Sequence, residues 1–326
     1  MNSARQRQTF RYARIGILIL ATLLVVLLID SAQIVREARD QTKVEAETYS
    51  AEVLFLAQGA YEDFWSDFGE TAVEEAASQG FKLQRLPLEI VESKSLEEQI
   101  DLAVRLNPDV LLLQTDGSEA VKEALERAVS AKIPVISLLN DQNLPPEVAY
   151  IGPNAYELAA LYTEEVEPLH EQYGDEILII VPPLAASVLT HHNFTQQLRM
   201  AFQQEGYDVS FLRPNRAEEF ILDELLYETL RNAENRPDIL ICLDSQDSLS
   251  VIRTLVDNNL VGQLGVITYY QNQEILDALE NQIVDSTLSL SAEDLATRAI
   301  RSAQEILETD RTSNYQILPM QFLDAS

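Results

Sequence analysis

The amino-acid sequence predicts an α/β fold built from two parallel sheets, each covered by helices on both faces. From residue 52 onward, short apolar runs with strand character alternate strictly with longer segments of helical periodicity. Several of these runs, such as VLLL at 110–113 and ILICL at 239–243, are continuously apolar, as in strands that are buried on both faces. A chain of 326 residues with 46% hydrophobic residues is also long enough to bury the cores of two lobes.

The first part of the pattern alternates without interruption. A strand over 52–58 precedes a helix over 63–79, which ends at Gly80 where a left-handed cap is expected. The helix over 95–106 opens on Ser95 with Glu98 three residues later, the spacing of a capping box. The other expected elements are strands over 81–90, 107–114, 133–139 and 148–153, and helices over 118–132 and 156–170.

The second part repeats this alternation and predicts the second sheet. Strands are expected over 176–183, 207–213, 237–244, 263–270 and 285–291. Helices are expected over 194–206, 220–233, 247–259 and 273–282. In sheets of this kind, ligands bind outside the carboxyl ends of the strands.

Composition argues against several functional classes. The balance of 23 Lys plus Arg against 53 Asp plus Glu gives a formal charge of −30, which opposes binding to nucleic acid. Cys242 is the only cysteine, so an intrachain disulfide and a cysteine-rich metal site are excluded. The sequence lacks G-x-S-x-G, G-x-x-x-x-G-K-[ST] and H-E-x-x-H motifs. The pair His191-His192 is interpreted as part of a surface loop and not as a metal site. From these observations together we expect no enzyme activity, metal or cofactor.

The N-terminus combines a basic flank with an apolar run. Four arginines precede the uncharged stretch IGILILATLLVVLLI, residues 15–29, which ends at Asp30. Its length alone fits either a signal peptide or a membrane span. The poor cleavage sequence DSA and the flanking Phe10 and Tyr12 favour an uncleaved anchor, while a buried helix of a cytosolic domain fits the arginines poorly. We therefore expect one transmembrane helix over 15–35, with residues 1–14 in the cytoplasm and the following domain outside the cell membrane.

Residues 36–51 are polar, lack Gly and Pro, and favour helix. They are interpreted as a stalk between the anchor and the folded domain. A solvated helix without a partner and a helix that docks on another protein remain open alternatives.

An ordered set of segments between Glu52 and Leu323 resembles a known family. These segments are AYEDFWSDFGETAVEEAASQG, PDVLLLQTDGSEAVKEALERAVSAKIPVISL, FTQQLRMAFQQEGYDV and PDILICLDSQDSLSVIRTLVDNNL. Their order and spacing resemble the type I periplasmic substrate-binding proteins of the ribose and galactose group, whose fold is shared by the sensing domain of lac-repressor-type regulators. The resemblance implies two lobes joined by crossing segments that close over a ligand. It places one lobe at 52–153 with 291–314 and the other at 154–290 with 315–326.

The resemblance also implies which residues contact the ligand. Phe64 and Trp65 match an aromatic pair that stacks on a sugar ring, with Trp65 pointing into the cleft; the alternative is that these rings form the first turn of a packed helix. The full expected site is Glu62, Phe64, Trp65, Asn140, Asp141, Asp244, Tyr269 and Tyr270.

Four polar contacts of the family's cleft are lost or displaced in this sequence, one of them a pair of residues. The family's Asp-Arg pair reads Leu139-Asn140, and an arginine, an aspartate and a glutamine read Leu198, Tyr270 and Leu290. Because a buried hydroxyl without a partner costs about 1–3 kcal/mol, a pentose or hexose fits this site poorly. The expected ligand has an apolar or aromatic face and can carry a positive charge. The alternative is a cleft that no longer binds a small molecule.

Two functional classes follow from the resemblance. One is a membrane-tethered receptor that presents its ligand to an ABC permease, and the other is a ligand sensor for a membrane histidine kinase or another receptor. A DNA-binding regulator would need a basic helix-turn-helix at the N-terminus, where the chain has an apolar run instead.

Overall fold

The computed structural model describes residues 49–56, 63–181, 192–214, 221–232, 236–309 and 311–324. The expected tail 1–14, the anchor 15–35, most of the stalk, Glu62 and His191 lie outside these ranges. Within the ranges, no helix is both long and apolar enough to span a membrane. Residues Ala51–Ser326 form one compact unit, which contains all the elements discussed below.

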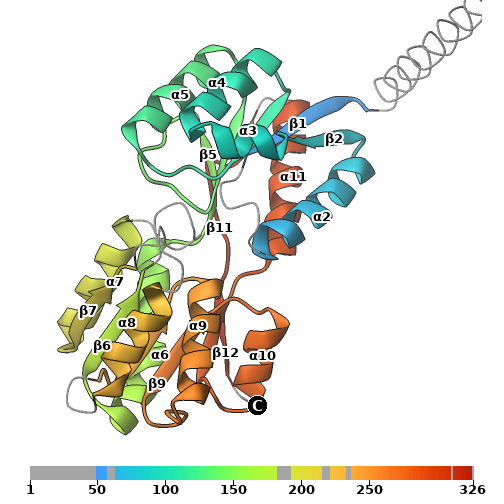
Figure 1. Ribbon diagram of the computed structural model, residues 1–326. Coiled ribbons are helices and arrows are strands. Elements are labelled where there is room, and N and C mark those ends of the chain that lie inside the picture. The colour runs from blue at the N-terminus through green and yellow to red at the C-terminus, as the bar shows by residue number, and fades with distance from the viewer. Residues whose placement is uncertain are drawn as a thin grey trace, which may run out of the picture. The chain divides into compact units, whose positions relative to one another are not determined.

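The first of two six-stranded sheets has the strand order β11-β5-β4-β3-β1-β2 (Figure 1). Its strands are β1 (Ala51–Leu56), β2 (Phe81–Arg85), β3 (Val110–Leu113), β4 (Val135–Leu138), β5 (Ala149–Gly152) and β11 (Tyr315–Ile317). The pairings between them are parallel. Strands β3, β4 and β5 are buried at every residue, as the continuous apolar runs predict.

The second sheet has the order β12-β10-β9-β8-β6-β7. Its strands are β6 (Glu176–Ile180), β7 (Asp208–Leu212), β8 (Ile239–Cys242), β9 (Gly265–Tyr269), β10 (Ser286–Ser289) and β12 (Gln321–Asp324). All its pairings are parallel except that β12 runs antiparallel to β10. The predicted pair of sheets, one for each lobe, is confirmed.

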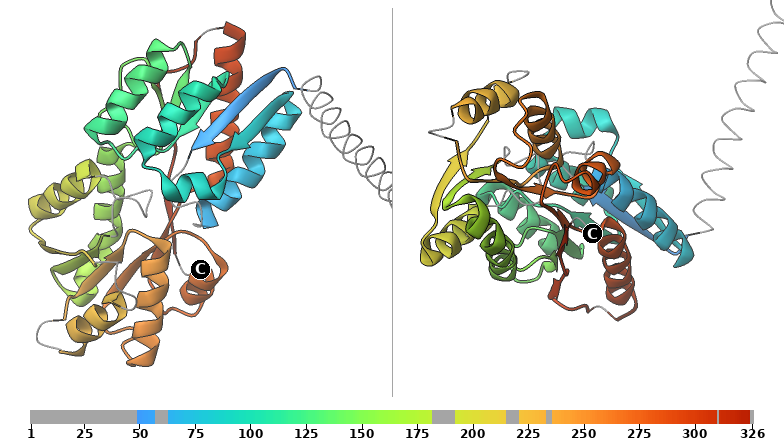
Figure 2. Two further views of the ribbon diagram at one scale, coloured as in Figure 1. Left: turned by 45° about the horizontal axis from the view of Figure 1, so that its top comes forward. Right: turned by 90° about the horizontal axis from the view of Figure 1, so that it is seen from below.

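Helices cover both faces of each sheet (Figures 1 and 2). In the first lobe, α2 (Asp63–Ser78) and α11 (Ala292–Thr309) pack on one face, and α3 (Leu88–Ser93), α4 (Leu96–Leu106) and α5 (Glu119–Ser130) on the other. In the second lobe, α6 (Ala155–Tyr173) and α7 (His192–Glu205) cover one face, and α8 (Ile221–Arg231), α9 (Ser245–Asp257) and α10 (Gln273–Glu280) the other. The core under α2, α11, α6 and α7 is one continuous cluster that includes side chains of both lobes.

Helices start and end at the residues that the local sequence signals predict. Ser95 and Glu98 form the capping box of α4. Gly80 follows α2 with a φ of 76°, the left-handed conformation that glycine tolerates best. The strand expected over 81–90 is too long, because β2 ends at Arg85 and Pro87 caps the short helix α3. Proline cannot donate to a strand ladder but is tolerated at the start of a helix.

The last crossing between the lobes lies later than the sequence indicated. The expected boundary followed residue 314, yet β11 pairs in register with β5 of the first sheet. The next strand, β12, pairs with β10 of the second sheet. The chain therefore crosses at 318–320, and the two earlier crossings follow β5 and β10.

Candidate functional site

The expected site residues that the structure describes follow strands of both sheets or open α2. Phe64 and Trp65 lie in the first turn of α2, eight and nine positions after β1 ends. Asn140 and Asp244 each lie two positions beyond the end of β4 and β8, and Tyr270 follows β9 directly. Both lobes thus contribute side chains at the carboxyl ends of parallel strands, where α/β sheets bind ligands.

An aromatic cluster forms the centre of this region. The Trp65 ring lies 5.0 Å from Phe64, 5.4 Å from Phe55 and 5.3 Å from Phe68, measured between ring centroids. Only 1% of Trp65 is exposed. Trp65 therefore does not point into an open cleft; its burial matches the alternative of a packed first helical turn. That Trp65 or Phe64 contacts a ligand stays a prediction.

Arg85 of β2 supports the aromatic cluster from the side. Its guanidinium lies 5.1 Å from the Phe55 ring centroid and donates a 2.8 Å hydrogen bond to the backbone oxygen of Trp65. Burial lowers the pKa of Arg85. The guanidinium can approach α2 this closely because residue 69 is glycine: a Cβ at this position would clash with the guanidinium. The rings and Arg85 thus form one packed assembly.

Tyr270 links the two lobes at this cluster. Its ring meets Phe64 edge to face with centroids 5.8 Å apart, and its phenol donates a 2.6 Å hydrogen bond to Oδ2 of Asp67. Its φ of 78° is costly for a residue with a side chain. Two hydrogen bonds hold this backbone, from Tyr270 N to the Leu288 oxygen and from Thr287 Oγ1 to the Tyr270 oxygen.

Asp67 is a site residue that sequence reasoning missed. It lies one helical turn after Phe64, so the two share a face of α2. That spacing could have shown Asp67 to be a neighbour of the aromatic pair. Its partner Tyr270 could not be found in this way, because the two are 203 positions apart in the chain.

The polar residues expected in the site form hydrogen bonds within their own lobes. Asn140 is buried, donates from Nδ2 to the Thr115 oxygen at 2.8 Å, and accepts from Gln142 N at 2.9 Å. Asp141 is exposed and accepts a 3.1 Å hydrogen bond from the Tyr315 phenol. These contacts stabilise the loop after β4 and tie it to β11.

Asp244 is a helix cap. Its carboxylate accepts from the backbone N–H groups of Gln246 and Asp247 at the start of α9, at 2.9 and 3.2 Å. The α9 turn is joined to β9 through Ser248, whose hydroxyl accepts from the backbone N–H of Tyr269. Tyr269 lies beside Tyr270, with ring centroids 6.1 Å apart. The structure thus brings Phe64, Trp65, Tyr269 and Tyr270 together, while Asn140 and Asp141 bond within the first lobe.

The positions where the sequence departs from sugar-binding patterns are part of the continuous core. Leu139, Leu198, Tyr270 and Leu290 are all buried in the cluster that spans both lobes. Cys242 is buried as well, and burial raises the pKa of its thiol, which keeps it protonated. Among the described residues, no group of three His, Cys, Asp or Glu side chains could hold a metal ion.

A family model described as a periplasmic binding protein domain matches residues 53–311. The chain belongs to the periplasmic binding protein family. No curated protein matches it. The match covers strands of both sheets but ends before β11 and β12, and it includes the residues of the aromatic cluster.

Solved structures of this family share the fold at low sequence identity. A periplasmic ribose ABC transporter from Conexibacter woesei DSM 14684 is 19% identical, with 85% of this chain and 93% of that chain covered and a TM-score of 0.68. A solute-binding protein from Burkholderia graminis C4D1M in complex with D-arabinose is 14% identical, with 85% and 96% covered and a TM-score of 0.73. A structure titled XylFII-LytSN complex is 15% identical, with 84% and 97% covered and a TM-score of 0.69.

Proposed function

We propose that the protein is an extracytoplasmic solute-binding receptor whose lobes close over a small ligand at the carboxyl ends of the two sheets. The contact between Phe64 of the first lobe and Tyr270 of the second carries the proposal. Rings from opposite lobes meet at the position where such sheets bind their ligands. A hinge motion about the crossing segments would separate the rings and open the site.

An apolar or aromatic ligand fits this site better than a sugar does. A sugar needs hydrogen bonds to several hydroxyls at once, and unpaired ones are costly when buried. Leu139, Leu198 and Leu290 carry no hydrogen-bonding side-chain group, whereas Phe64 and Tyr270 contribute rings. Asp67 adds a carboxylate beside these rings. Rings and a carboxylate together favour a ligand with an aromatic or aliphatic body and a positive charge.

The proposal includes a tether to the cell membrane. The apolar run over 15–29 follows four arginines, and the positive-inside rule then leaves the folded domain outside. We expect the full-length chain in the membrane fraction of intact cells, with the domain open to added protease. A mature N-terminus near residue 33 in the medium would contradict the tether.

Two kinds of membrane partner fit a tethered receptor. A similar structure is titled as a periplasmic ribose ABC transporter, which favours delivery of the ligand to an ABC permease. Another similar structure is a complex with a second protein, LytSN, which favours the alternative of a receptor that reports its conformation to a membrane sensor such as a histidine kinase. Pull-down of the full chain from its own membranes distinguishes permease subunits from a kinase.

A receptor without a small-molecule ligand is the second candidate. It is favoured by the nearly complete burial of Trp65 and by the Tyr270 to Asp67 hydrogen bond, since the site's own side chains then satisfy one another. In that case the outer surface of the two lobes would bind a partner without any change of conformation.

A thermal-shift screen separates the two candidates. The full chain is screened against amines, aromatic amines, nucleosides, amino acids and sugars, and emission of Trp65, the single tryptophan, is followed for each hit. A ligand at 100 times its dissociation constant adds roughly 2.7 kcal/mol, which a melting curve resolves. We expect hits among the aromatic and aliphatic amines that also change Trp65 emission. A screen without any hit would favour the receptor without a ligand.

A further inference from the structure

A cavity lies at the segments that cross between the lobes. It has a volume of about 300 Å³. Its lining consists of Pro153, Asn154, Glu157, Leu158, Leu161, Ile317, Leu318, Pro319 and Met320. None of the aromatic residues of the candidate site lines it. Ligand pockets in proteins have volumes of roughly 300–1,000 Å³, so this cavity suits a small molecule.

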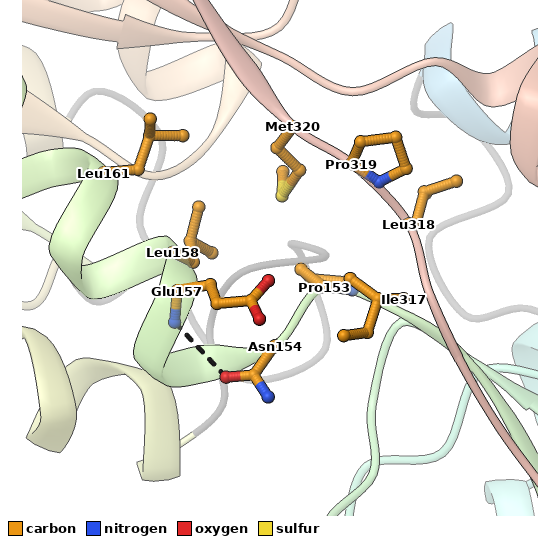
Figure 3. A pocket seen from close by; sticks show the side chains of 9 residues that line it. All are labelled: Pro153, Asn154, Glu157, Leu158, Leu161, Ile317, Leu318, Pro319 and Met320. Carbon is orange, nitrogen blue, oxygen red and sulfur yellow. Dashed lines mark hydrogen bonds between the residues drawn. The ribbon is translucent and has the colours of Figure 1, made fainter.

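The cavity is bounded by two of the three crossings. One wall is the segment after β5 with the first two turns of α6, and the other is the chain from the end of β11 to Met320. Figure 3 shows Leu158 on the α6 wall and Met320 on the other wall, with the cavity between them. A hydrogen bond from Leu318 N to the Gly152 oxygen holds the two crossings together.

Most of the cavity wall is apolar. Seven of its nine lining residues are Leu, Ile, Met or Pro, and Ile317 is 44% exposed although it is a large hydrophobic residue. Tyr156 and Tyr315, which neighbour lining residues in the chain, are also exposed large side chains. Contact between the apolar lining residues and the body of an apolar ligand would remove their surface from water, which is favourable.

The charge at the cavity is negative. Glu157 is exposed on the first turn of α6, and among the described residues no Lys, Arg or His forms an ion pair with it. Burial first, and then the nearby charges of Asp141 and Glu157, raise the pKa of Tyr315 to about 12. Two carboxylates therefore act on this part of the surface, Glu157 from the first turn of α6 and Asp141 from the loop after β4.

The amino terminus of α6 does not reverse this charge. A helix terminus is equivalent to about half a positive charge, which is less than the full negative charge of Glu157. The Asn154 side chain already accepts from the backbone N–H groups of Tyr156 and Glu157, at 2.9 and 3.2 Å. These two donors, which would otherwise attract an anion, are satisfied within the chain.

We propose that this crossing-segment cavity is a second ligand site, separate from the cleft, for a small organic ammonium ion with an apolar body. The apolar body occupies the space between Leu158 and Met320, and the ammonium group donates to the Glu157 carboxylate. Apolar walls supply the contact area, and the carboxylate selects cations over neutral and anionic molecules of the same shape.

Methionine methyl NMR on the full chain tests the site directly. The chain contains three methionines, of which Met320 lines the cavity and Met200 is an exposed residue of α7. The probes are 2-phenylethylammonium, 2-phenylethanol and 3-phenylpropionate, which share an aromatic body and differ in charge. We expect saturable shifts of the Met320 methyl with the ammonium ion at lower concentration than with the other two, and no shift of Met200.

Two variants with a matched control assign the binding. Glu157→Gln is expected to weaken ammonium binding about tenfold, because it removes the charge from the hydrogen bond. Glu167→Gln removes the same charge from an exposed position about 15 Å further along α6 and should leave the affinity unchanged. Ile317→Trp fills the cavity from an exposed edge strand and should abolish the Met320 response without a large change in melting temperature.

Several results would overturn the proposal. They are an unmoved Met320 methyl, equal affinity for the three probes, or equal loss of affinity in the Glu157 and Glu167 variants. If Ile317→Trp fails to fold, the comparison of the two glutamine variants still decides the result. A probe that changes Trp65 emission but not the Met320 signal binds in the cleft instead, and that outcome also counts against the second site.

Discussion

The phenol of Tyr270 and the carboxylate of Asp67 form a 2.6 Å hydrogen bond between the two lobes. Tyr270 follows β9 of the second sheet, and Asp67 lies on α2 of the first lobe. The same tyrosine ring also contacts Phe64. This pair therefore holds the lobes together at the candidate site, and a ligand that enters between the rings must replace its contacts.

Removal of the Tyr270 hydroxyl should weaken the closed state. Tyr270→Phe keeps the ring contact with Phe64 but loses the hydrogen bond, which we expect to lower the free energy of unfolding by about 1 kcal/mol because Asp67 is exposed. Chemical denaturation measures the loss. Asp67→Asn and the double variant complete a double-mutant cycle. The coupling energy between the two positions should account for most of the stability lost in Tyr270→Phe. Tyr227→Phe, at an exposed position of α8, is the control.

The burial of Trp65 leads to a clear expectation for stability. Trp65→Ala removes a ring that packs on Phe55, Phe64 and Phe68, so we expect a loss of about 3–5 kcal/mol. The emission of the parent protein should be typical of a buried tryptophan. Val73→Ala, at an exposed position of the same helix, should change stability little. A Trp65→Ala variant as stable as the parent would show that the ring is not part of the core in solution.

Gly69 and Arg85 should be coupled. Alanine normally favours a helix over glycine by about 1 kcal/mol, but a Cβ at position 69 displaces the Arg85 guanidinium from the Trp65 oxygen and the Phe55 ring. We therefore expect Gly69→Ala to be destabilising in the parent and neutral or stabilising in an Arg85→Ala background. Urea denaturation of the four proteins gives the comparison. The same effect of Gly69→Ala in both backgrounds would refute this packing.

Prediction from the sequence succeeded where the determining interactions are local. The alternation of apolar and amphipathic segments identified the two sheets, and Ser95 with Glu98 identified the start of α4. It failed where the interactions are distant. Strand β11 is short and only partly apolar, so its pairing with β5 has no local signal. The Tyr270 partner of Asp67 likewise comes from a segment that only the folded chain brings near.

An acidic contact between α6 and the second sheet should make stability depend on pH. Burial, followed by nearby Asp324 and Asp285, raises the pKa of Glu165. Burial also raises the pKa of Asp285, against a hydrogen bond from Val266 N. The folded protein therefore keeps these protons to higher pH than the unfolded chain does. Their contribution to stability is full below the ordinary carboxyl pKa and is lost as pH rises through the raised values.

Glu165→Gln tests this pH dependence. Glutamine removes the titrating group, so we expect the variant to melt higher than the parent at neutral pH and to show a flatter dependence between about pH 4 and pH 8. Glu164→Gln, the exposed neighbour, should follow the parent. Identical pH profiles for the parent and Glu165→Gln would mean that the carboxyl group titrates alike in the folded and unfolded chains.

The distance between the lobes in solution tests the receptor account most directly. Cys242 is buried, so spin labels attach selectively at Glu126→Cys on α5 and Asp257→Cys on α9, both exposed positions in opposite lobes. Distance distributions are measured by electron spin resonance without ligand and with the compound that most raises the melting temperature in the screen. We expect a broad distribution with an open population in the free protein, which the compound converts to a single narrow one. A single narrow distribution that no compound changes would contradict a receptor that closes over a ligand.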